Sequence, residues 1–276
     1  MNPVEKALWF IENHFAEPIG LEDVASVAGV SRHHMARAFG AATGRPVMRY
    51  VRGRRLTEAA RALAAGAPDI LSVALEAGYE SHEAFTRAFR DQFGATPEKV
   101  RATRCLATLS LVEPLRMTDI QTLPLSPPRI ETRPPLLIAG LSERYEGTNA
   151  GMPAQWQRFV PWIGHVPGQI GQATYGVCYN GDGEGDIDYL CGVEVSDFNA
   201  LPADLARLRV AEQTYAIFTH AGHISTIQRT WASIFSQWFP GAGRERADAP
   251  EIEHYDERFD PQTGNGGFEI WIPLKP

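Results

Sequence analysis

The segment LEDVASVAGVSRHHMARAFGAATG, residues 21–44, is repeated further along the chain as ILSVALEAGYESHEAFTRAFRDQFG, residues 70–94. The turn glycines align at an offset of 49 residues and the Arg-Ala-Phe triplets that follow at an offset of 50, so the second copy has one extra residue in its turn. Each copy reads as a short amphipathic helix, a glycine turn, a serine cap and a second helix, which is the helix-turn-helix pattern. The repeat therefore predicts two DNA-reading helices in one chain.

Length and composition indicate two folded domains. A chain of 276 residues with 44% hydrophobic and 10% aromatic residues has enough apolar surface for more than one core. Its N-terminus lacks the features of a secretory signal, and we expect no membrane-spanning segment. The three cysteines are odd in number and lack metal-binding spacing, which favours a reducing cytoplasm and no disulfide framework. His220 and His223 have no evident third ligand, so we expect no metal, and we expect no cofactor.

Charge is divided unequally along the chain, whose net charge is −7. Residues 1–107 hold 14 Lys/Arg and 12 Asp/Glu, a net of +2, whereas residues 108–276 hold 12 and 21, a net of −9. Basic residues also cluster between the two repeats. This asymmetry suggests different partners for the two halves. The clustered arginines are Arg45, Arg49, Arg52, Arg54 and Arg55.

Helical phase separates an inward from an outward face in each second helix. The predicted core positions are Met35, Ala38, Phe39 and Ala42 in the first copy, and Phe85, Ala88, Phe89 and Phe93 in the second. Ser31 and Ser81 are the predicted caps. The outward faces are short or cationic in both copies, as a helix that enters the major groove requires.

The segment from residue 3 to residue 104 resembles the DNA-binding domain of the AraC/XylS family of transcriptional regulators. The resemblance rests on LEDVASVAGVSRHHMARAF, on the connecting GRRLTEAARAL and on SVALEAGYESHEAFTRAFRDQFGATPEKVR. It implies that both recognition helices enter successive major-groove segments, held by the central helix, and that RNA polymerase is a further partner. The implied base-reading residues are Arg32, His33, Ala36, Arg37, His82, Glu83, Thr86 and Arg87.

The pattern changes after this domain. We expect a DNA-binding domain over residues 1–106, a linker over 107–127 that contributes at most a strand, and a second domain over 128–276. In the second domain the hydrophobic period becomes mostly that of strands, interrupted by helices near residues 154–163 and 223–239. The prediction is a multidomain protein with an all-α N-terminal domain and an α+β C-terminal domain.

The last predicted strand, GFEIWIP, places a carboxylate beside an indole. Alternation puts Phe268, Ile270 and Ile272 on one face, and Glu269 and Trp271 on the other. A buried carboxylate needs a cationic partner, and nearby aromatic rings favour an organic cation. A solvent-facing glutamate beside an interfacial tryptophan is the alternative.

The order of WQRF, TYGVCYN, DYLCGVEV, TYAIFTHAGHISTIQRTWASIFSQWFP and FEIWIPLK resembles the GyrI-like, Rob C-terminal type of ligand-binding domain. This resemblance implies two strand-helix-strand-strand units about a pseudo-twofold, with a groove for amphipathic, often cationic, molecules. The residues it implies for the groove are Glu269, Trp271, Tyr189, Tyr175, Trp156 and Trp231.

These observations predict a sequence-specific transcriptional regulator that is not an enzyme. Its N-terminal domain would bind a double-stranded DNA operator and its C-terminal domain a small amphipathic or cationic effector. Two alternatives stay open. The second domain is a GyrI-like hydrolase with Glu269 as general base, or it is a protein-interaction module without a small ligand.

Overall fold

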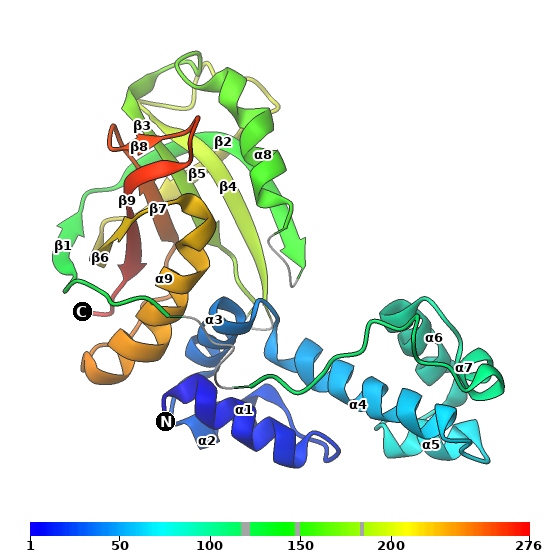
Figure 1. The fold of residues 1–276 in the computed structure, drawn as a ribbon. Helices are drawn as coiled ribbons and strands as arrows, with labels where there is room; N and C mark the ends of the chain where they lie inside the picture. The colour runs from blue at the N-terminus through cyan, green and yellow to red at the C-terminus, as the bar shows by residue number, and fades with distance from the viewer. Residues whose placement is uncertain (117–121, 147–149, 183–184) are drawn as a thin grey trace. The chain divides into compact units, whose positions relative to one another are not determined.

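The computed structural model describes residues 1–116, 122–146, 150–182 and 185–276 (Figure 1). The chain divides into two compact units, one made of residues 1–35 and 45–120, the other of residues 36–44 and 121–276. We call them the helical unit and the sheet unit, and each is described by itself. In the described part of the chain, no helix combines the length and the apolar character that crossing a bilayer requires.

Helices account for the regular structure of the N-terminal part. Their bounds are α1 Pro3–His14, α2 Leu21–Ala28, α3 Arg32–Thr43, α4 Val47–Ala64, α5 Ile70–Glu76, α6 His82–Phe93 and α7 Pro97–Thr103. The pairs α2–α3 and α5–α6 are the two predicted helix-turn-helix copies. The expected all-α class is therefore confirmed for this part of the chain.

The turn and cap residues of both copies are those that the sequence pattern predicted. Gly29 and Gly78 adopt the left-handed conformation, with φ of 74° and 82°, which glycine accepts without a Cβ clash. Ser81 caps α6 by accepting a hydrogen bond from the Ala84 amide at 3.1 Å. Ser31 accepts the corresponding bond from the His34 amide at 3.3 Å. The two turns thus orient two helices in the same way.

Aromatic side chains form the core of the second copy. Phe85 and Phe89 are fully buried, and Phe93 is nearly so, in a cluster with α4, α5 and α7 side chains. Their rings contact one another at centroid distances of 5.4 Å and 4.8 Å. Burial of three aromatic rings dominates the packing of this small bundle. In α3, the predicted core residues Met35, Ala38 and Phe39 are also buried.

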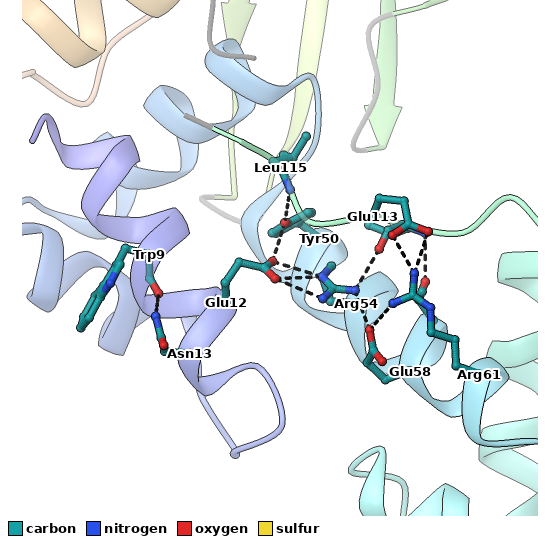
Figure 2. A network of polar contacts seen from close by, with 11 residues as sticks. Trp9, Glu12, Asn13, Tyr50, Arg54, Glu58, Arg61, Glu113 and Leu115 are labelled. Carbon is teal, nitrogen blue, oxygen red and sulfur yellow. Dashed lines mark hydrogen bonds and ion pairs between the residues drawn. The ribbon is translucent and has the colours of Figure 1, made fainter. Parts of the chain in front are cut away.

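The first part of the predicted linker packs along α4 rather than forming a strand (Figure 2). Thr57 Oγ1 accepts a hydrogen bond from the Val112 amide at 2.9 Å, and Arg54 donates to the Val112 carbonyl at 3.1 Å. A Cβ at Gly53 would lie 2.7 Å from Val112 Cγ2. The linker passes directly over this point of α4, so a residue without a Cβ is needed at position 53. The described residues 107–116 and 122–127 contain no strand, and residues 117–121 lie outside the described part.

Strands and short helices build the sheet unit. Their bounds are β1 Arg129–Arg133, β2 Leu136–Glu146, α8 Met152–Phe159, η2 Val160–Trp162, β3 Gln169–Tyr179, β4 Asp186–Val195, β5 Ala206–Val210, β6 Gln213–Ala221, η3 Ile224–Thr226, α9 Ile227–Ser233, η4 Ile234–Trp238, η5 Phe239–Gly241, β7 Glu251–Tyr255, β8 Phe259–Asp260 and β9 Asn265–Pro273.

The strands form one antiparallel sheet in the order β1-β6-β9-β7-β3-β4-β2-β5, with β8 paired to β9. This order contains two strand-helix-strand-strand units, β2-α8-β3-β4 and β6-α9-β7-β9, that meet where β3 pairs with β7. Outward from this junction, each half runs in the matching order, β3-β4-β2 and β7-β9-β6. The α+β class and the paired units are therefore as predicted.

The helix expected over residues 223–239 is broken into short pieces. A 3-10 turn, Ile224–Thr226, leads into α9, which is followed by a π-helical segment, Ile234–Trp238, and a second 3-10 turn. Hydrophobic periodicity cannot distinguish these variants because their periods differ little over so few residues. The element beside the central strands thus combines α-, π- and 3-10-helical turns.

Candidate functional sites

The outward face of α6 offers two exposed charged side chains one helical turn apart. Glu83 and Arg87 are both exposed, at positions i and i+4. Thr86 is half-buried, and its Oγ1 has no hydrogen-bond partner among the described residues. His82 is half-buried and its Nε2 lies 3.0 Å from a Glu98 carboxylate oxygen. Glu83 and Arg87 are thus the most accessible groups on this helix face.

The corresponding face of α3 is less uniform. Arg32 and His33 are exposed, and Arg32 Nε lies 3.5 Å from a carboxylate oxygen of Glu22. Ala36 is buried at 8% exposure, although the helical phase predicted an outward position. An alanine methyl group lies close to the helix backbone, so longer side chains one turn away can cover it. Arg37 lies in residues 36–44, which group with the sheet unit.

The arginines of α4 divide into structural and accessible groups. Arg54 is buried and binds the Glu12 carboxylate with Nε and Nη2 at 3.1 Å, and it also pairs with Glu58 (Figure 2). Arg55 donates to the backbone carbonyls of Phe15 and Glu17. Arg54 therefore holds α1, α4 and the linker together and is not available to DNA. The exposed arginines of the cluster are Arg45, Arg49 and Arg52.

A buried carboxylate surrounded by aromatic side chains lies on the helix-covered face of the sheet. Glu253 on β7 accepts hydrogen bonds from the Tyr189 hydroxyl at 2.9 Å, the Tyr255 hydroxyl at 3.0 Å and the Trp231 indole at 3.3 Å. The Trp156 indole donates to Tyr189 Oη at 2.9 Å. These five side chains, which we call the Glu253 cluster, come from α8, α9, β4 and β7.

The electrostatics of the Glu253 cluster are unusual for a carboxylate. Glu253 is only 8% exposed, and all three hydrogen bonds that it accepts from described residues come from neutral groups. Burial raises the pKa of its carboxyl above the ordinary value, even though the three donors favour the ionised form. By contrast, Glu251 on the same face of β7 has two arginine partners, Arg246 at 2.8 Å and Arg37, which is itself one of the predicted DNA contacts. In the described part of the chain, Glu253 is therefore hydrogen-bonded by neutral groups alone, and Arg37 of the same unit acts on it through its charge without donating a hydrogen bond to it.

A glycine opposite Glu253 makes this arrangement possible. Gly176 on β3 is paired in register with Glu253, at the junction of the two strand-helix-strand-strand units. A Cβ at Gly176 would lie 2.3 Å from Tyr189 Oη and 2.6 Å from Glu253 Oε2. Any side chain at this position would displace the hydroxyl or the carboxylate, so the missing side chain leaves the space that both groups occupy.

Glu269 belongs to a different set of contacts on the opposite face of the sheet. Its carboxylate accepts hydrogen bonds from Arg129 at 2.9 Å and from the Trp271 indole at 2.9 Å, and it lies 3.3 Å from Arg258 Nη2. His254 Nδ1 lies 3.5 Å away, which is too long for a strong hydrogen bond. These five residues form the Glu269 cluster. The neighbouring side chains of His254, Arg129 and Trp271 favour the ionised carboxylate and hold the pKa of Glu269 well below its usual range.

Trp271 also has a cationic partner within the protein. The guanidinium carbon of Arg133 lies 4.5 Å from the centre of the Trp271 ring, a distance that permits a cation–π interaction. Tyr175, on the same face of the sheet, has its hydroxyl 3.3 Å from Glu194. The positive charge that the sequence predicted for a ligand at Glu269 is thus supplied here by arginines of the chain.

The structure divides the six predicted ligand residues between the two faces of the sheet. Tyr189, Trp156 and Trp231 belong to the Glu253 cluster, whereas Glu269, Trp271 and Tyr175 lie on the opposite face. Glu253 and Tyr255 were missed. Their signal was available, because alternation in EIEHY places Glu251, Glu253 and Tyr255 on one face of a central strand. In the described ranges, no group of three His, Cys, Asp or Glu side chains could hold a metal ion.

Comparison with known proteins relates the two parts of the chain to different families. Residues 126–275 match the GyrI-like small molecule binding domain, and residues 24–103 match a helix-turn-helix domain. The chain is 27% identical to the transcriptional regulator Rob of Salmonella typhimurium, over 99% of this chain and 98% of Rob. It is 33% identical to the multiple antibiotic resistance protein MarA of Escherichia coli, over 41% of this chain and 88% of MarA. The transcriptional regulator BrlR of Pseudomonas aeruginosa is 30% identical over 53% of this chain and 54% of BrlR.

Proposed function

Since the chain belongs to the AraC/XylS family of DNA-binding transcriptional regulators and carries a C-terminal GyrI-like small-molecule-binding domain, we propose that it senses a lipophilic organic cation at the Glu253 cluster. The domains we propose are a DNA-binding domain over residues 1–106, a linker over 107–127 and a ligand-binding domain over 128–276. Acting on DNA, the protein would work in the cytoplasm.

The observation that carries this proposal is that Glu253, although buried, accepts hydrogen bonds from neutral groups alone among the described residues. A buried carboxylate whose hydrogen bonds come from two phenols and an indole attracts positive charge strongly, because little water screens it. The Trp231 and Trp156 rings add apolar surface and π-faces that suit an organic cation better than a hydrated metal ion. The irregular helix of residues 224–241 would adjust to effectors of different size and shape.

For DNA, we propose that Glu83 and Arg87 of α6 contribute most to base recognition. Both are exposed, and arginine can pair bidentately with guanine while glutamate can accept from cytosine N4. We propose His82, Thr86, Arg32, His33, Ala36 and Arg37 as the remaining contacts. Effector binding would bias DNA engagement or contact with RNA polymerase, and linkage requires effector and DNA to change each other's affinity by the same factor.

Calorimetric titration of the full chain tests the sensor role. Tetraphenylphosphonium serves as the cationic probe, and triphenylphosphine oxide, which is neutral and carries three of the same rings, is its control. Saturable binding of the cation with weaker binding of the neutral compound is expected. Equal affinity for both compounds, or no saturable binding of cations of this class, would contradict the proposal. Repeating the titration with duplex DNA present measures the linkage.

A hydrolase remains the second candidate, because a carboxylate held by two tyrosine hydroxyls also has the parts of a general base with acidic partners. The relatives Rob and BrlR are transcriptional regulators, which makes the sensor the better-supported function. Product release from an activated ester such as p-nitrophenyl acetate, lost in Glu253→Gln, would favour the hydrolase. Saturable cation binding without turnover would favour the sensor.

A further inference from the structure

A small cavity in the helical unit lies between α4 and the turn that follows α5. It has a volume of about 140 Å³. A cavity needs only about 10–15 Å³ to hold one water molecule, so a tetrahedral oxyanion has ample room here. The lining residues come from two segments, Met48, Val51, Arg52 and Arg55 of α4 and Ala77, Gly78 and Tyr79 of the turn.

Two guanidinium groups line this cavity without a carboxylate to neutralise them. Arg52 is exposed and makes no hydrogen bond or ion pair with any described residue. Arg55 donates to the backbone carbonyls of Phe15 and Glu17, which carry no net charge, so its positive charge also remains uncompensated. Arg54, between them in sequence, differs because it is neutralised by acidic partners. The cavity therefore has an excess of positive charge on its α4 side.

The opposite wall supplies a neutral donor. Tyr79 Oη is buried and has no hydrogen-bond partner among the described residues of the protein. Burial raises the pKa of Tyr79 above its ordinary value, so its hydroxyl stays protonated at neutral pH and can donate. A buried polar group without a partner requires an explanation. A ligand with free oxygen acceptors would provide one.

Gly78 keeps the two walls close together. Its φ of 82° belongs to the left-handed region, and a Cβ there would lie 3.2 Å from Arg55 Nη1. Because Arg55 also reaches the carbonyls that follow α1, it touches the segments that flank both helix-turn-helix copies. The cavity is thus lined by α4 and by the turn that precedes α6, and Arg55 connects it to the segment that precedes α2.

We propose that Arg52, Arg55 and Tyr79 form a binding site for a phosphate group. Two guanidinium groups and a protonated hydroxyl can all donate hydrogen bonds, which matches the acceptor oxygens of a phosphate group. The inference deepens the proposed DNA-binding function, because a backbone phosphate of the operator is one source of this group. Free inorganic phosphate is the other source, and two measurements distinguish them.

The first measurement is the salt dependence of the full chain's affinity for a random-sequence DNA duplex. Each phosphate neutralised contributes about 0.9 to the slope of log affinity against log salt. Arg52→Gln is expected to lower that slope by about 1. Tyr79→Phe should weaken binding severalfold at each salt concentration without changing the slope. Arg244→Gln, which removes an exposed arginine of the sheet unit, is the matched control and should bind as the parent does.

The second measurement is the melting temperature in inorganic phosphate against chloride at equal ionic strength. Free phosphate is the ligand if it raises the melting temperature of the parent and of Arg244→Gln but not of Arg52→Gln and Tyr79→Phe. Changes confined to DNA binding would identify the DNA backbone. If both variants match the parent in both measurements, the site does not exist. If the parent chain binds no DNA, the proposed function fails and the melting temperatures alone decide the phosphate site.

Discussion

Replacing Glu253 by glutamine should weaken cation binding far more than the same change at Glu269. The substitution keeps the size of the side chain and removes the charge that lies among Tyr189, Tyr255 and Trp231. Two unit charges about 4 Å apart interact by about 4 kcal/mol at an effective dielectric constant near 20. At that dielectric constant, this value is the limit of what the carboxylate can contribute before the costs of binding are subtracted.

Two costs reduce that limit. The cation loses hydration on entering the cluster, and burial raises the pKa of Glu253, which disfavours the ionised form that attracts the cation. We therefore expect Glu253→Gln to weaken tetraphenylphosphonium binding by about 1–3 kcal/mol, which is roughly 5- to 150-fold. Glu269 is already paired with Arg129 and Arg258, so Glu269→Gln should change affinity by less than about threefold.

Isothermal titration calorimetry on the parent chain and the two variants measures these affinities. Triphenylphosphine oxide is titrated alongside, and its affinity should be similar in all three proteins because it carries no charge. Thermal unfolding of each variant shows that loss of binding is not loss of structure. A larger loss of cation affinity in Glu269→Gln than in Glu253→Gln would refute the assignment of the ligand charge to β7.

Three further outcomes follow from the structure. Gly53→Ala should lower the free energy of unfolding in urea by about 1–3 kcal/mol, because its Cβ would lie 2.7 Å from Val112 Cγ2. The control Gly40→Ala, whose Cβ meets nothing within 4 Å, should be neutral or stabilising. Equal effects of the two substitutions would contradict the packing argument. Arg87→Ala should cost about 1–3 kcal/mol on a selected DNA site and relax sequence preference, and an equal loss on random DNA would argue against base reading. The pKa of Glu269 is lower in the folded than in the unfolded protein, so its ionised form stabilises the fold above the unfolded-state pKa. This contribution is lost as pH falls, so Glu269→Gln should lose less stability than the parent when the pH is lowered from about 5. Thermal unfolding at a series of pH values measures the difference.

The pattern of apolar residues was sufficient to predict the architecture but not which carboxylates of the sheet unit are paired with arginines. Helix and strand periodicity indicated both helix-turn-helix copies, the α+β second half and the alternation in β9 that separates Ile270 from Glu269. The same pattern could not show that β1 and the segment after β7 bring Arg129 and Arg258 to Glu269, because those pairings join residues far apart in sequence. Whether a carboxylate is neutralised depends on such long-range contacts.

Local sequence also could not distinguish the roles of neighbouring arginines in α4. Arg54 and Arg52 are two positions apart in a basic cluster, yet one is buried against Glu12 and Val112 while the other is exposed. The difference arises from helical phase combined with the path of the linker over Gly53, which turns one face of α4 into core. A net charge count treats both as equivalent, although only the exposed one can meet a phosphate.

The position of Glu253 follows from the symmetry of the sheet unit. The two strand-helix-strand-strand units meet at β3 and β7, so α8 and α9 each send an indole, Trp156 and Trp231, toward the same central strands. A side chain at the junction would fill the space between them, and Gly176 leaves that space to a carboxylate and a phenol. Because each half supplies part of the cluster, a ligand held there contacts both halves at once. Binding would then stabilise the junction itself, which is the element through which an effector can change the conformation of the unit.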